Sequence, residues 1–172
     1  MPMIRMAFRG LLLLVALGAV SVCGYRPLYG TNADGSNVSG DLAGIKVEEQ
    51  RTRTGQLVRN ELLSALGRSA DGTSPYALKL EPEEKIIGVS VIVGQKLERK
   101  RYRLNVKYYL LSTSTGQIVT QGSSFSNVSY DTVREPIADL QASENARNRA
   151  TREVAEDIRL RLSAFLATSH GS

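Results

Sequence analysis

The sequence predicts an α+β domain in which two helices pack on one face of a mostly antiparallel four-stranded sheet, a two-layer sandwich. Three patterns support this prediction. Apolar residues recur at helical spacing near residue 60, apolar and polar residues alternate in several segments between residues 76 and 130, and a longer helical repeat follows from residue 139 to residue 166. A block of strands flanked by helices is typical of such two-layer domains.

The first two elements are a short strand and a helix. Ile45 and Val47 alternate with charged residues, which predicts a strand. A helix is expected to begin at Thr54 or a neighbouring residue and to end at Gly67, because glycine commonly follows the last helical residue. Its apolar side consists of Leu57, Val58, Leu62, Ala65 and Leu66.

Two strand segments follow, at residues 76–81 and 85–93, with Gly88 at a bulge or bend. The clearest strand runs from Arg101 to Leu111, where apolar and polar side chains alternate strictly. Such alternation favours an antiparallel sheet with one covered and one polar face. Thr115-Gly116 predicts a turn, after which residues 118 to about 130 return as the partner strand.

The last element is a long helix over residues 139–166. At about 1.5 Å per residue it would span roughly 40 Å, which is enough to cross the sheet. Its expected core stripe consists of Ala146, Ala150, Val154, Ile158, Leu162 and Phe165. The rest of its surface is mostly charged, so this helix should have one buried side and one exposed side.

The N-terminus resembles an export signal that ends at a cysteine. Arg5 and Arg9 precede a short apolar run, and Cys23, the single cysteine of the chain, comes soon after it. We expect residues 1–22 to be a lipoprotein signal peptide and Cys23 to carry acyl chains that hold the protein at a membrane. An ordinary cleaved signal peptide with an incidental cysteine is the alternative.

The remaining chain divides into three parts in this interpretation. Residues 23–40 are the lipid anchor and a tether rich in Gly, Asn, Ser and Asp, residues 41–168 form a single α+β domain, and residues 169–172 are a disordered tail. The chain carries a formal net charge of +5, which the loss of Arg5 and Arg9 with the signal lowers to +3. For an exported lipoprotein, phosphates of lipid head groups are a more plausible polyanion than nucleic acid.

Catalytic and metal-binding patterns are absent from the sequence. The single histidine, His170, lies two residues from the C-terminus and is poorly placed to act as a general base. No nucleophile elbow, phosphate-binding loop or zinc-ligand spacing occurs. We therefore expect a protein that is not an enzyme and needs no cofactor or metal.

A cationic cluster is the main candidate binding site. Arginine and lysine match phosphate oxygens, and several on one stiff strand should bind a polyphosphorylated lipid such as lipopolysaccharide. The cluster consists of Lys96, Arg99, Lys100, Arg101 and Arg103, with Lys107 further along the same strand face. Alternatively, these charges only keep a sheet edge or face soluble.

Several segments together resemble the LPS-assembly lipoprotein LptE family. They are the residues Cys-Gly-Tyr-Arg-Pro-Leu-Tyr-Gly at 23–30, Arg59-Asn60-Glu61-Leu62, the strand with its Thr115-Gly116 turn, and the long charged helix. The resemblance implies two helices on a four-stranded sheet and a lipoprotein on the periplasmic side of the outer membrane. It also implies that the chain plugs the barrel protein LptD and assists lipopolysaccharide assembly.

Small and hydroxylated residues of the partner strand would suit hydrogen bonding to a polar barrel lumen. These residues are Gly122, Ser123, Ser124, Ser126 and Ser129. Two alternatives to the barrel plug are an accessory lipoprotein of another envelope transporter and, from a different class, a periplasmic lipoprotein enzyme.

Overall fold

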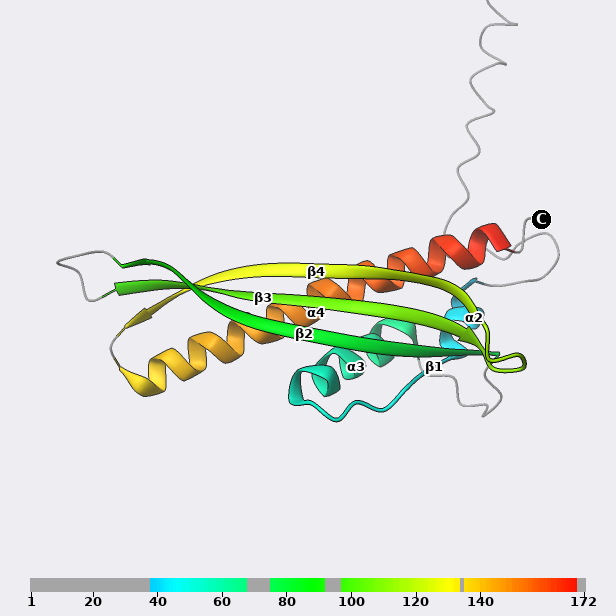
Figure 1. Cartoon of the computed structure of the whole chain (residues 1–172), viewed down its shortest axis with the longest axis horizontal. Coiled ribbons are helices and arrows are strands. Elements are labelled where there is room, and N and C mark those ends of the chain that lie inside the picture. Colours follow the sequence, from blue (N-terminus) through cyan, green and yellow to red (C-terminus); the bar gives the residue numbers. More distant parts are fainter. Residues whose placement is uncertain (1–37, 68–74, 92–96, 134, 170–172) are drawn as a thin grey trace, which may run out of the picture. The chain divides into compact units, whose positions relative to one another are not determined.

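The computed structural model describes residues 38–67, 75–91, 97–133 and 135–169. The α+β fold predicted from the sequence is confirmed (Figure 1). Its elements are α2 (Val38–Ala43), β1 (Ile45–Val47), α3 (Arg53–Leu66), β2 (Tyr76–Val91), β3 (Leu97–Ser112), β4 (Ile118–Val133) and α4 (Pro136–Ser169).

The four strands form one sheet in the order β1-β2-β3-β4. The pairs β2–β3 and β3–β4 are antiparallel, so these three strands form a meander. β1 pairs parallel with β2 because α3 carries the chain back across the sheet between them. This strand–helix–strand unit accounts for the one parallel pair in a sheet that is otherwise antiparallel.

Helices α3 and α4 lie on the same side of the sheet (Figure 1). The 34 residues of α4 span about 50 Å at about 1.5 Å per residue, and a 16-residue strand spans a similar length at about 3.3 Å per residue. One helix therefore covers the strands along their length. Fully buried side chains from both layers meet between them, among them Val58, Leu104, Val106, Ile158 and Leu162.

The ends of α3 show why this segment is helical. The side chain of Thr52 accepts a hydrogen bond from the backbone nitrogen of Gly55 at 3.1 Å, which caps the first turn. A Cβ atom at Gly55 would lie 2.9 Å from the Thr52 hydroxyl, so the capping turn requires glycine there. At the other end, Gly67 has a φ of 79°, as expected from its predicted position after the helix.

Strand β2 differs from the prediction because it runs without interruption through Pro82. β1 pairs with β2 only at Tyr76–Leu78, so the outer side of β2 is unpaired at Pro82 within the described part of the chain. A proline without an N–H group is tolerated on such an edge. The predicted irregularity at Gly88 is confirmed, since the register with β3 shifts between Gly88 and Ser90.

Helix α4 begins at Pro136 and ends at Ser169, three residues beyond the predicted boundaries at each end. Proline is favoured in the first turn, where its missing N–H is not needed. Five of the six predicted core residues are fully buried, whereas Phe165 is only partly buried and Leu166 takes its place. The sequence therefore predicts the stripe but not its last residue.

The short helix α2 was not predicted. Residues 38–40 were assigned to the tether, but Val38 starts a helix, and the buried Leu42 packs in the core. Six residues are too few to show an apolar helical repeat, which explains the omission. The predictions for residues 1–37, including the lipidation of Cys23, and for residues 170–172 concern segments outside the described residues.

Candidate anion-binding surface on the open face of the sheet

Strand β3 divides its side chains between two environments. Tyr102, Leu104, Val106, Tyr108 and Leu110 face the helices and are 0–5 % exposed, as the alternation predicts. The intervening side chains lie on the opposite face of the sheet, which no described helix covers. We call this the open face; on β3 it carries Arg99, Arg101, Arg103, Asn105, Lys107 and Tyr109.

The three arginines at one end of the open face have different surroundings. Arg99 forms a two-pronged ion pair with Asp131 of β4, at 2.7 and 3.0 Å. This hydrogen bond and the opposite charge raise the pKa of Arg99 and lower that of Asp131. Arg103 donates to the neutral side-chain oxygen of Asn127 at 3.0 Å. Arg101 lies opposite Ser129 and has no ion-pair partner among the described residues.

A fourth cation joins them from the neighbouring strand. Lys85 of β2 lies directly opposite Arg103, and Ile87 lies opposite Arg101. Like charges in opposite positions of an antiparallel pair are destabilising unless an anion lies between them. Within the described part of the chain no carboxylate pairs with Lys85, Arg101 or Arg103, so this end of the open face is suited to an external anion.

The structure does not bring together all five predicted residues. Lys100 is on the helix face, where its ammonium group lies 3.1 Å from a carboxylate oxygen of Asp139 in α4. Its side chain connects β3 to α4 and is not on the surface formed by Arg101 and Arg103. Lys96 lies outside the described residues.

Sequence reasoning missed Lys85 because it is distant in sequence from the cluster, and only the register of β2 with β3 places it there. The notebook of charges along β3 alone also overstates the reach of the surface. Lys107 is on the open face as expected, but Glu81 lies directly opposite it. The anion-binding surface therefore consists of Lys85, Arg101 and Arg103, with Arg99 at its margin.

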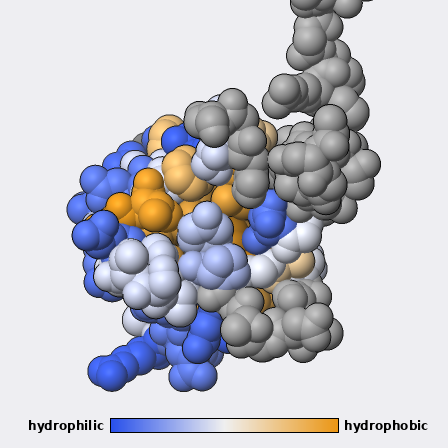
Figure 2. Space-filling model, turned by 90° about the vertical axis from the view of Figure 1, so that its right-hand side faces the viewer, coloured by the Kyte–Doolittle hydropathy of each residue, from blue (hydrophilic) through white to orange (hydrophobic). Residues whose placement is uncertain are grey.

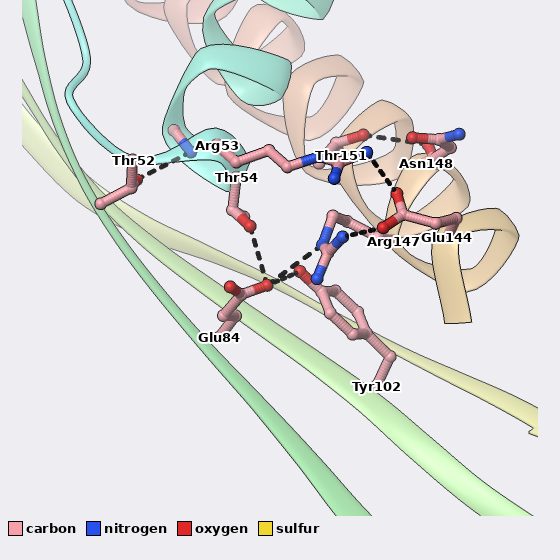
Figure 3. Close-up of polar contacts among 10 residues, drawn as sticks. Thr52, Arg53, Thr54, Glu84, Tyr102, Glu144, Arg147, Asn148 and Thr151 are labelled. Carbon is pink, nitrogen blue, oxygen red and sulfur yellow. Dashed lines mark hydrogen bonds and ion pairs between the residues drawn. The ribbon is translucent and has the colours of Figure 1, made fainter. Parts of the chain in front are cut away.

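A polar cluster lies on the other face, where β2, β3, α3 and α4 meet (Figure 3). The carboxylate of Glu84 accepts hydrogen bonds from Thr54 at 2.7 Å, from Arg147 at 3.3 Å and from the Tyr102 hydroxyl. The Arg147 guanidinium also lies 5.7 Å from the centre of the Tyr102 ring and 2.6 Å from Glu144. These contacts tie both helices to the two strands.

The electrostatics of this cluster indicate a structural role. Partial burial by itself would raise the pKa of Glu84, but the hydrogen bonds from Tyr102 and Thr54 and the charge of Arg147 lower it overall. Burial and the hydrogen bond to Glu84 raise the pKa of Tyr102 to about 12. A carboxylate held ionised by three donors is a weak base, because protonation would disrupt those bonds.

The expected hydroxylated strand face of β4 is divided in the same way as β3. Ser124 and Ser126 are buried beneath α4, and Ser126 donates to Glu153 of that helix at 2.5 Å. Gly122 also faces α4, where the Tyr108 ring lies across it. Only Ser123 and Ser129 of the five residues lie on the open face. The sequence analysis was wrong in grouping them, because it ignored the alternation along this strand.

No group of His, Cys, Asp and Glu that could hold a metal ion occurs among residues whose positions are described. The helices in the described ranges include none long and apolar enough to cross a membrane.

Comparison with known proteins gives solved structures but no sequence family. Neither a protein-family model nor a curated protein matches the sequence. The crystal structure of a candidate lipoprotein from Caulobacter crescentus CB15 is similar, with a TM-score of 0.65 and 28 % sequence identity. The match covers 77 % of this chain and 96 % of the Caulobacter chain.

A minor lipoprotein from Acinetobacter baumannii has the same fold, with a TM-score of 0.52, 15 % identity, and coverage of 70 % of this chain and 88 % of that one. A rare lipoprotein B from Shewanella oneidensis aligns with a TM-score of only 0.40 and 12 % identity, too low to support an argument. The Caulobacter similarity, together with Cys23 after a signal-like segment, supports an envelope lipoprotein.

Proposed function

We propose that the chain is an outer-membrane lipoprotein, anchored through Cys23 on the periplasmic side, that plugs and supports an LptD-type β-barrel and assists lipopolysaccharide assembly. The observation that carries the lipopolysaccharide part is the pairing of Lys85 with Arg103 beside Arg101, on a sheet face without a compensating carboxylate at that end. Guanidinium groups on a stiff strand suit the phosphates of this lipid.

The architecture is compatible with both tasks. The open face has polar and charged side chains from three long strands, and a barrel lumen is likewise lined by polar groups. The helices bury the other face completely enough to form a core, so the domain does not depend on the barrel for its stability. Contact with a barrel can therefore use the open face while the fold remains unchanged.

Purification of the full chain from membranes tests this function. We expect an outer-membrane barrel of the LptD type to co-purify, and the mature N-terminal peptide to begin at Cys23 with the mass of attached acyl chains. The Cys23→Ala variant is the matched control and should lose the added mass. An inner-membrane transporter in place of the barrel would favour the accessory-lipoprotein alternative, and an unmodified N-terminus at another residue would contradict the lipid anchor.

A further inference from the structure

The two long edges of the sheet are protected very differently. The unpaired part of β2 carries Pro82, four charged residues of its open face, and a bulge after Gly88. Such features prevent an edge from pairing with a strand of another molecule. β4 has no proline, and its first charged residue is Asp131, near its end. No described strand pairs with the outer side of β4.

β4 also carries exposed apolar side chains. Phe125, at the middle of the strand on the open face, is 71 % exposed, and Ile118 and Val119 at its start are 53 % and 39 % exposed. The start of β4 lies at the end of the domain viewed in Figure 2, where apolar groups reach the surface. A long, uncharged edge with an exposed phenylalanine at its centre has the properties of a strand-pairing site.

We propose that β4 pairs antiparallel with β4 of a second copy of this chain, with Phe125 opposite Phe125 of the other copy, to form one continuous eight-stranded sheet. This register places Ser123 opposite Asn127 of the second copy and Gln121 opposite its Ser129. On the open face each side-chain amide therefore meets a hydroxyl, and the two phenylalanine rings meet at the twofold axis.

The same register avoids electrostatic conflict. Asp131 would lie opposite Val119 of the second copy, so no like charges face each other along the strand pair. A second copy is the favoured partner because it supplies an equally unprotected edge. A closed β-barrel has no free edge, so this pairing is separate from the barrel contact of the proposed function.

Cysteine cross-linking of the full chain carrying Cys23→Ala tests the register. Opposite residues of an antiparallel pair have Cβ atoms about 4.5–5.5 Å apart, within reach of a disulfide after small adjustments. Phe125→Cys should form a disulfide-linked dimer on mild oxidation. Ser123→Cys mixed with Asn127→Cys should cross-link more than either variant alone. Glu83→Cys, exposed on the open face of β2, is the control and should remain monomeric.

Sedimentation of the chain with Cys23→Ala tests the interface without cross-links. We expect a dimer that dissociates in the Phe125→Lys variant, because two ammonium groups would then meet at the axis. Leu160→Lys changes a half-exposed residue of α4 by the same charge and should leave the dimer intact. Circular dichroism should show unchanged folding in both variants. A monomer at all concentrations, a dimer that survives Phe125→Lys, or equal cross-linking of Glu83→Cys would overturn the proposal.

Discussion

The two faces of β3 show how one strand can serve two purposes. On the helix face, Tyr102, Leu104 and Val106 are fully buried and hold the sheet to the helices. On the open face, Arg101 and Arg103 alternate with them and contribute little to the core. Because neighbouring residues of a strand point to opposite faces, stability and anion binding depend on different residues of the same segment.

This separation means that changes on the two faces should have different consequences. Substitutions on the helix face remove buried contacts and destabilise the fold, whereas substitutions on the open face alter charge at the surface. The following predictions test that difference, beginning with the core.

The largest expected effect comes from Ile158, a fully buried residue at the middle of α4. Ile158→Ala should lower the free energy of unfolding by about 2–5 kcal/mol, because it removes buried aliphatic groups and leaves a cavity. Denaturant unfolding measures this change. The matched control is Arg152→Ala on the exposed side of α4, which should change stability by less than about 0.5 kcal/mol. Equal effects of the two substitutions would show that the buried side of the helix is wrongly assigned.

Arg159, its immediate neighbour, is a poorer control than the sequence suggests. Its side chain is only 13 % exposed and pairs with Glu156 at 2.5 Å. Arg159→Ala would therefore remove packing and an ion pair together.

A smaller effect is expected at Gly122, on the helix face of β4. A Cβ atom added there would lie 2.6 Å from the Tyr108 hydroxyl, so the ring would have to move within the core. Gly122→Ala should destabilise the domain by about 1–3 kcal/mol, the usual range for an overpacked site. Ser123→Ala, on the open face of the same strand, should be nearly neutral in thermal unfolding. A neutral Gly122→Ala would mean that Tyr108 can leave this position freely.

The Glu84 cluster should give a smaller and pH-dependent effect. The folded pKa of Glu84 is below its ordinary value of 4.5, so its stabilising contribution is complete above that pH and is lost as the pH falls through the folded pKa. Glu84→Gln should cost about 1 kcal/mol near neutral pH, a low value because 42 % of the side chain is exposed.

Urea unfolding at about pH 7 and about pH 3 tests this sign, because the difference between the natural chain and Glu84→Gln should shrink at the lower pH. Glu83→Gln, on the open face of the same strand, is the control. A difference that grows with acidification would contradict the assignment of Glu84 as an ionised acceptor.

Sequence patterns predicted most of the fold but only part of the candidate site. The alternation along β3 identified Tyr102 through Leu110 as core, because a period of two is visible without knowing the partner strands. The contribution of Lys85 and the removal of Lys100 depend on register and on α4, which local patterns do not contain. The burial of Ser124 and Ser126 was missed because their hydroxyls are paired by the helix, an interaction that composition cannot reveal.

The central claim is that lipopolysaccharide binds to the open face through Lys85, Arg101 and Arg103. The most direct test is the affinity of the full chain and of a variant with all three changed to Gln, measured at low and physiological salt. The matched control changes the exposed cations Arg51, Arg149 and Arg152 to Gln, which alters the net charge equally.

The account predicts that only the open-face variant loses affinity, with unchanged thermal stability. Binding by the natural chain should also weaken as the Debye length falls to about 8 Å at physiological salt. Equal losses in both triple variants, or an affinity indifferent to the open-face changes and to salt, would contradict it.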